Sequence, residues 1–343
     1  VQHRLHHGEL VQVGVEQALD DAGHGGVSLV AAPHSSGAVH GSVTTLHRAP
    51  AQCGMPREPL APALLRQLRA IDRHLPAPRV RRLHLPPVLP ERPREAEFCA
   101  IELADGAFGL SYVLLDQSLA QLIARHRPAG AGDAPPLVGA DALALAAAFG
   151  GSDGAANALA LAAINALTQS AWRRLGYAPP AADNSVGDVA LAPGDHLGMI
   201  GGFTPLVRQV LNVGAALSIV ELDAQKVQRL QAEFPQILAT LDRAALAPCN
   251  KIVATSTMLL NGTLDAMLAA CPAATEFALI GPSAGLWPDA LFERGVTRLC
   301  GTQVVDGAAF AEAMARGERW GGAARKFAID RAAWPGWQAL LAG

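Results

Sequence analysis

Residues 278–296, ALIGPSAGLWPDALFERGV, predict a short apolar strand, a loop of small residues and a helix, in that order. Pro288 suits the first helical position, and Gly295 suits the position just past the helix end. The loop GPSAG between strand and helix either connects the two elements or holds a ligand. The rest of the chain bears on that choice.

From about Asp188 onward, apolar strands alternate with amphipathic helices, which is typical of a mostly parallel sheet. HLGMIG is the first strand, ALSIVELD the second and NKIVAT another, while TRLCGTQVV is the last strand that the pattern predicts. In the tail from Gly317 onward, the pattern predicts irregular structure around GERWGGAARKF (317–327). The fold class expected for this half is a Rossmann-like α/β domain.

The half before it has a different pattern and predicts a smaller α+β domain. Two β-rich runs flank Asp105-Gly106, which is a strong hairpin signal. We expect four parts: residues 1–54 as a disordered arm or over-extended start, 55–178 as the α+β domain, 179–330 as the Rossmann-like domain, and 331–343 as a C-terminal tail. Residues 1–54 hold seven of the eleven histidines, and Met55 is the first methionine, so we place the native start near Met55.

Composition excludes several classes of protein. The formal net charge of −3 gives no basic excess for nucleic acid. The apolar runs are shorter than the roughly 18 residues that a membrane span needs. Five scattered cysteines without a C-x-x-C pair fit a reducing cytoplasm. A homodimer is the default expectation if the protein is an oligomer.

Three loops of small residues leave predicted strands at one end of the sheet. They are GMIGGFTP (198–205), TSTMLLNGT (255–263) and GPSAG (281–285). Ligands of such sheets bind beyond the carboxyl ends of the strands, so three such loops favour a ligand site. The first loop departs from G-x-G-x-x-G. Glu221 and Asp223 follow at the spacing of a ribose-binding acid, but they equally suit the end of a strand and the start of a helix.

Other polar residues leave more than one reading open. Asn165 lies on or beside the apolar face of a helix, where it is as well suited to tie down a neighbouring loop as to contact a ligand. His196 stands near a strand start, at the wrong end of the sheet for the loops. Ser283 has no base assigned by a motif, so a nucleophilic role is not indicated. No metal-binding motif selects a ligand set.

Several segments together resemble a family of unknown function described as "putative heavy-metal chelation". These segments are AAINAL, IGGFTPLV, IVELD, ATSTMLLNGTLDAML and the opening stretch, and the resemblance spans residues 79–327. It implies an enolase N-terminal-like α+β domain, a Rossmann-like domain and a ligand site in the cleft between them. The candidate ligand-binding residues in these segments are Asn165, Gly201, Thr204, Pro205, Glu221, Thr257, Asn261, Gly262, Thr263, Gly281, Pro282, Ser283 and Asp289.

The chain departs from the family pattern at two places. Cys249, Asn250 and Lys251 stand where the family commonly has an acidic residue, and Gly202 stands where a larger polar residue is expected. If the latter position contributes a ligand in the family, this chain has lost it.

The resemblance and the residues support three functional hypotheses. The first is a cytoplasmic protein that binds a small molecule, a divalent transition metal or a metal complex in the cleft and acts in metal-cofactor metabolism, with Glu221 and Asp289 as metal ligands. Oxygen donors alone favour harder metals, so a complex held through its organic part fits better than a bare ion. The second is an enzyme using S-adenosylmethionine or NAD, with Glu221 or Asp223 on a ribose. The third is a non-catalytic carrier or assembly partner.

Overall fold

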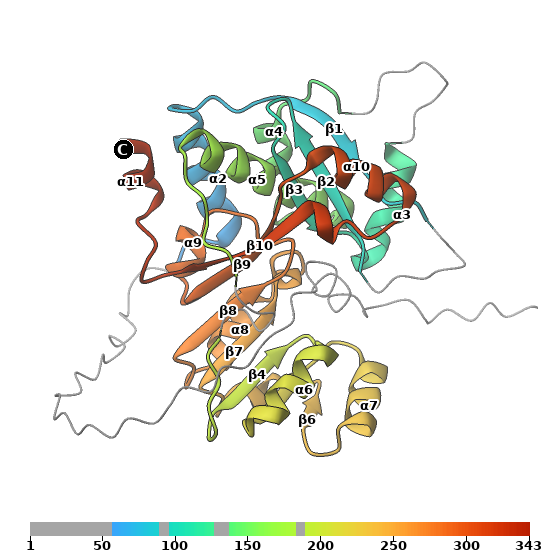
Figure 1. The fold of residues 1–343 in the computed structure, drawn as a ribbon, viewed down its shortest axis with the longest axis vertical. Helices are drawn as coiled ribbons and strands as arrows, with labels where there is room; N and C mark the ends of the chain where they lie inside the picture. Colours follow the sequence, from blue (N-terminus) through green and yellow to red (C-terminus); the bar gives the residue numbers. More distant parts are fainter. Residues whose placement is uncertain (1–56, 89–95, 127–136, 183–188) are drawn as a thin grey trace, which may run out of the picture.

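A seven-stranded sheet forms the larger part of the computed structural model, which describes residues 57–88, 96–126, 137–182 and 189–343 (Figure 1). Its strands are β4 (His196–Ile200), β5 (Ala216–Val220), β6 (Leu238–Thr240), β7 (Lys251–Thr255), β8 (Glu276–Ile280), β9 (Arg298–Val304) and β10 (Ala324–Asp330). The spatial order is β10-β9-β8-β7-β4-β5-β6, and every pairing is parallel except β9 with β10. The six strands from β4 to β9 lie in the 3-2-1-4-5-6 order of a Rossmann fold when numbered along the chain, so the predicted Rossmann-like sheet is confirmed.

Short helices connect these strands. They are α6 (Thr204–Val213), α7 (Ala224–Glu233), α8 (Leu264–Ala270), α9 (Asp289–Phe292) and α10 (Gly307–Arg316), with 3-10 turns η2 (Arg243–Leu246), η3 (Ser256–Leu259) and η4 (Gly321–Ala323). The helix α11 (Trp337–Ala342) follows the last strand. Pro205 lies in the first turn of α6, and Gly214 ends that helix in the left-handed conformation at φ 78°. Both agree with the sequence signals. None of the helices in the described ranges is both long and apolar enough to cross a membrane.

A three-stranded antiparallel sheet forms the smaller part. It comprises β1 (Val80–His84), β2 (Phe98–Leu103) and β3 (Phe108–Tyr112), and it is accompanied by α2 (Leu60–Asp72), η1 (Leu115–Gln117), α3 (Ser118–Arg125), α4 (Ala142–Ala146) and α5 (Gly154–Arg174). The predicted hairpin is confirmed, because β2 and β3 pair across a turn in which Gly106 has φ +84°. The mixed α/β class is therefore as expected.

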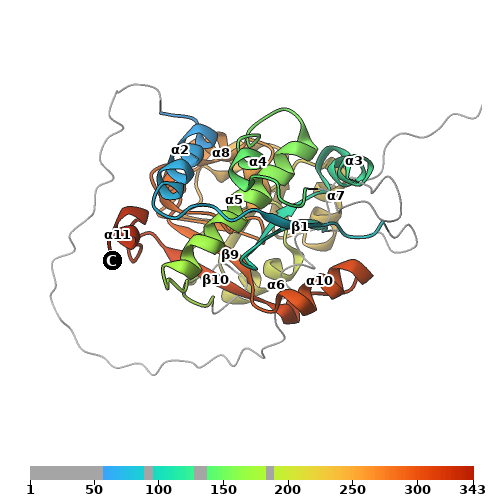
Figure 2. The ribbon, with the colours of Figure 1, turned by 90° about the horizontal axis from the view of Figure 1, so that it is seen from above.

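The helix α5 joins the two parts and crosses the middle of the molecule (Figure 2). From Asn157 to Trp172 every residue of α5 is buried, so this helix has no solvent face. The backbone of α5 lies directly against the backbone of β3 at Gly109. A Cβ on Gly109 would lie 2.0 Å from the backbone nitrogen of Ala166. Only glycine permits that approach of strand to helix.

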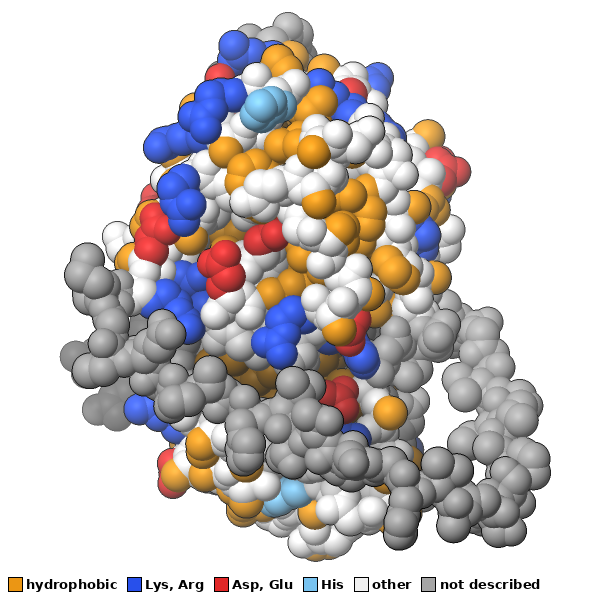
Figure 3. Space-filling model, turned by 90° about the vertical axis from the view of Figure 1, so that its left-hand side faces the viewer, with side chains coloured by type: hydrophobic (Ala, Val, Ile, Leu, Met, Phe, Trp, Pro, Cys, Tyr) orange, Lys and Arg blue, Asp and Glu red, His pale blue; other side chains and the backbone are white. Residues whose placement is uncertain are grey.

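The helix α10 adds a second contact between the two parts. Its Phe310 packs edge-on against Phe108 of the small sheet, with ring centroids 5.3 Å apart, and Trp320 packs against Phe98 at 6.0 Å. One hydrophobic cluster therefore contains side chains of both sheets. On the face seen in Figure 3, charges of both signs lie among hydrophobic side chains, as the near-balanced composition predicts.

Two sequence expectations were wrong about the elements. The region after Gly317 is not irregular, because β10 pairs with β9 over seven residues and α11 follows. The strand β6 went unpredicted. Both are edge strands, and β10 buries only Phe327 and Ile329 fully, so neither carries a strong apolar pattern. Residues 1–54, the proposed arm, lie outside the described residues.

Candidate functional site

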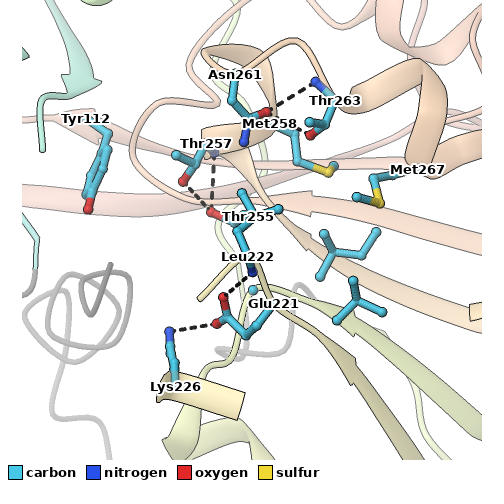
Figure 4. Close-up of a pocket in the computed structure, with 13 residues that line it drawn as sticks. Tyr112, Glu221, Leu222, Lys226, Thr255, Thr257, Met258, Asn261, Thr263 and Met267 are labelled. Carbon is cyan, nitrogen blue, oxygen red and sulfur yellow. Dashed lines mark hydrogen bonds and ion pairs between the residues drawn. The ribbon is translucent and has the colours of Figure 1, made fainter. Parts of the chain in front are cut away.

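A pocket lies at the carboxyl ends of β4, β5 and β7, at the point where the strand order reverses (Figure 4). It is lined by Tyr112, Ile200, Gly201, Val220, Glu221, Leu222, Lys226, Thr255, Thr257, Met258, Asn261, Thr263 and Met267. Its cavity of about 50 Å³ has room for a few water molecules. All but Tyr112 come from the large sheet and from the loops and helices that follow its strands.

The loop after β4 is shaped by two glycines. Gly201 turns the chain at φ +84°, and its N–H donates to the carbonyl of Val220. Gly202 is buried, and a Cβ there would lie 2.8 Å from Leu230 and 3.1 Å from Glu221 Oε1. A larger residue at this position would have to displace the Leu230 side chain and would crowd the Glu221 carboxylate. Thr204 begins α6 just beyond this loop.

Glu221 is the carboxylate of the pocket, and its oxygens are already engaged. The side chain of this buried residue accepts hydrogen bonds from the backbone N–H groups of Gly202 and of Leu222, the latter at 3.2 Å. Its Oε1 also lies 2.8 Å from Nζ of Lys226, which is itself only 9% exposed. The buried acid is thus neutralised by a buried base, as low-dielectric surroundings require.

Hydroxyl and amide groups line the opposite wall, after β7. The Thr255 side chain caps η3 and shares a 2.7 Å hydrogen bond with the hydroxyl of Thr257. Further along the loop, Asn261 Oδ1 accepts from the hydroxyl of Thr263 at 2.7 Å. Gly262 lies between these two residues and has φ +67°. Loop residues of this kind offer oriented polar groups to a small ligand.

Tyr112 brings the small sheet into the pocket. It ends β3, and its side chain is 4% exposed. Burial raises the pKa of its hydroxyl well above the usual value, and the nearby negative charges of Glu221 and Glu97 raise it further. The hydroxyl therefore stays protonated and serves as a hydrogen-bond donor. The hairpin signal predicted the strand, but nothing in the sequence indicated that its last residue would face Glu221.

The GPSAG loop (residues 281–285) ties the two sheets together and does not line the pocket. Ser283 Oγ accepts from the backbone N–H of Tyr112 at 2.9 Å, and its carbonyl accepts from Asn165 Nδ2 at 2.9 Å. The same amide nitrogen donates to the carbonyl of Leu110 at 2.7 Å. Gln169 adds a bond to the carbonyl of Gly285 at 3.1 Å. Of the two roles considered for Asn165, the structural tie is the one that these contacts describe.

Asp289 is placed away from the pocket lining. Its two oxygens accept from Gln67 Nε2 at 2.9 Å, from Trp334 Nε1 at 2.9 Å and from the backbone of Trp337 at 3.2 Å. It thereby links α2, α9 and the segment that leads into α11. The structure does not bring it together with Glu221.

The predicted site residues therefore fall into three groups. Gly201, Glu221, Thr257, Asn261 and Thr263 line the pocket, while Thr204 and Gly262 adjoin it in the chain. The tie between the sheets holds Asn165, Gly281, Pro282 and Ser283, with Gly281 packed against the Ser256 side chain. Asp289 stands apart. Sequence analysis missed Tyr112, Lys226, Met258 and Met267 as pocket residues.

Metal-binding side chains do not gather in the part of the chain that the structure describes, where no three His, Cys, Asp or Glu side chains form a group. Burial raises the pKa of Cys99 and Cys271 to about 12 and that of Cys249 to about 11, so these thiols are not poised as thiolate ligands. His196 is the first residue of the inner strand β4, at the amino end of the strand and opposite the pocket, where its Nε2 lies 2.8 Å from Ser218 Oγ.

Comparisons with known proteins agree with this architecture. Two family models, both described as "Putative heavy-metal chelation", match residues 96–168 and 186–332. Two solved structures of proteins of unknown function from the family matched by the second region are similar to this chain. The Pyrococcus horikoshii protein has 18% identity and a TM-score of 0.55, and the Desulfitobacterium hafniense protein has 20% identity and a TM-score of 0.56. Each comparison covers 79% of this chain and 99% of the other. No curated protein matches.

Proposed function

Because the chain belongs to the family described as "Putative heavy-metal chelation", we propose that it binds a metal complex in the pocket and holds the complex through its organic part. The metal is cargo in this proposal. The pocket in question is the one at the carboxyl ends of β4, β5 and β7.

The main support for this proposal is that the Glu221 carboxylate already has partners at both oxygens. Among the described residues that line the pocket it is the only anion, and Lys226 is the only cation. A bare divalent ion would have to displace Lys226 and two backbone donors from that carboxylate, and it would then sit beside a buried ammonium group. The donor set thus does not suit a bare ion, whereas it leaves the remaining pocket groups free to bind an organic ligand.

The other walls support an organic ligand. Ile200, Val220 and the half-exposed Leu222 supply apolar contact, and the thioethers of Met258 and Met267 add soft, adaptable surface. Hydroxyl and amide groups of the loop after β7 can form directional hydrogen bonds with such a ligand. Small-molecule sites commonly combine such a mostly apolar lining with a few placed polar groups.

Isothermal titration of the full chain tests the proposal. We expect a metal complex to bind where the chloride salt of the same metal does not. Thr257→Val should weaken that binding about fivefold, since one neutral hydrogen bond contributes about 1 kcal/mol. Thr302→Val, in β9, is the matched control and should bind as the wild type does. Binding of the bare ion alone, or equal affinity in both variants, would contradict the proposal.

A nucleotide-dependent enzyme is the alternative that one observation favours. Glu221 follows β5 at the switch point of the sheet, where an acid binds ribose in dinucleotide-binding folds. The same titration with S-adenosylmethionine and NAD separates the two functions. Binding of a nucleotide and of no metal complex would replace the chelate proposal. Binding of none of these compounds would favour a carrier or assembly role.

A further inference from the structure

The pocket offers an excess of hydrogen-bond donors. Lys226 Nζ has three N–H donors, and Glu221 is its only partner among the described residues. Asn261 uses its amide oxygen for Thr263, while its amide nitrogen has no partner within the described ranges and is turned toward Thr255 and Thr257 in Figure 4. The strongest acceptor, Glu221, is by contrast engaged at both oxygens.

The hydroxyl of Tyr112 is the clearest of these donors. The side chain is 4% exposed, and its oxygen forms no hydrogen bond with any described residue. This oxygen is not one of the fully buried atoms without a partner, so water reaches it from the pocket. Figure 4 shows this hydroxyl and the amino group of Lys226 on the same side of the pocket. Both donors are therefore available to a ligand that carries hydrogen-bond acceptors.

The size of the cavity limits what enters it. At about 10–15 Å³ of cavity volume per water molecule, 50 Å³ holds a group of about three to five heavy atoms. A carboxylate with its adjoining carbon is of that size, whereas an entire chelated metal ion is not. The remainder of such a ligand would lie at the mouth, over Leu222, which is 57% exposed.

We propose that the pocket takes a carboxylate arm of the chelating ligand, which accepts hydrogen bonds from Lys226 Nζ and the Tyr112 hydroxyl. This inference rests on the proposed function and adds the chemical class of the ligand. Lys226 can donate hydrogen bonds to this arm, but its positive charge is balanced by the negative charge of Glu221. Orientation of the donors therefore selects the arm, and long-range attraction contributes little.

Three probes titrated into the full chain test this inference: nickel ethylenediaminetetraacetate, whose metal has no open position for a histidine, ethylenediaminetetraacetate alone, and nickel tris-bipyridine, whose ligands carry no carboxylate. We expect the first to bind, the second to bind more weakly and the third not to bind. Tyr112→Phe should weaken binding of the first at least about tenfold, the effect of losing a hydrogen bond to a charged group. The matched control is Tyr177→Phe, which alters the only other tyrosine of the chain and should change nothing.

The outcomes separate the two proposals. Binding of the bipyridine complex without the carboxylate probes would overturn the carboxylate arm and leave the metal-complex function standing. Equal binding of ethylenediaminetetraacetate with and without nickel would overturn the metal-complex function and keep the anion pocket. Equal affinity of the two tyrosine variants would remove Tyr112 from the site. Failure of all three probes to bind would contradict both proposals.

Discussion

Replacing Ser283 by alanine should loosen the contact between the two sheets. Ser283 Oγ is fully buried and accepts the backbone N–H of Tyr112 at 2.9 Å. Without it, that N–H is buried with no acceptor, which costs about 1–3 kcal/mol. Ser111 provides the matched control one residue away, because it is equally buried but its hydroxyl has no partner. Ser111→Ala removes the same atom and should be neutral or stabilising.

Urea unfolding followed by tryptophan fluorescence measures both variants, since Trp172, Trp287 and Trp334 cluster near this contact with ring centroids 5.9–6.5 Å apart. We expect the midpoint to fall for Ser283→Ala at an unchanged slope, and to stay or rise for Ser111→Ala. Equal losses in the two variants would refute the argument, because the effect would then come from the lost volume and not from the hydrogen bond.

Three further outcomes follow from particular contacts. Gly109→Ala should cost more than about 4 kcal/mol or prevent folding, because its Cβ would meet helix backbone, whereas Gly322→Ala, with open space around it, should be neutral by the same urea titration. Burial lowers the pKa of His84, although the neighbouring Glu102 acts to raise it. The stability of the fold should therefore fall as the pH drops below about 6.5, the pKa of histidine in the unfolded chain. His84→Gln should make stability depend less on pH in thermal melts. Asp289→Ala should raise amide hydrogen exchange in α11 and leave ligand affinity unchanged; weaker binding would return Asp289 to the site.

The role of the GPSAG loop (residues 281–285) could not be predicted from the sequence. Small residues at a strand end indicated either a connector or a ligand loop, and both roles use the same residues. In the structure, GPSAG makes contacts with α5 and β3, more than a hundred residues earlier in the chain, and these contacts link the two sheets. Asn165 left the same ambiguity, for the same reason. The loops after β4 and β7 had the same composition, and they do line the pocket.

Local chemistry thus determined much of this protein. Apolar periodicity predicted the helices and inner strands, Asp105-Gly106 predicted the hairpin, and the order of strands and helices predicted a parallel sheet, because each depends on residues close together in the chain. The edge strands β6 and β10 escaped, since they bury little. Only the tertiary structure showed that Lys226 pairs with Glu221, that Tyr112 joins them in the pocket lining, and that Asp289 bonds with Gln67 and Trp334 outside that lining. The pair of Lys226 and Glu221 depends on how the chain turns from β5 into α7. The other two relations depend on long-range packing, which brings residues far apart in the chain into contact and leaves no periodic trace in the sequence.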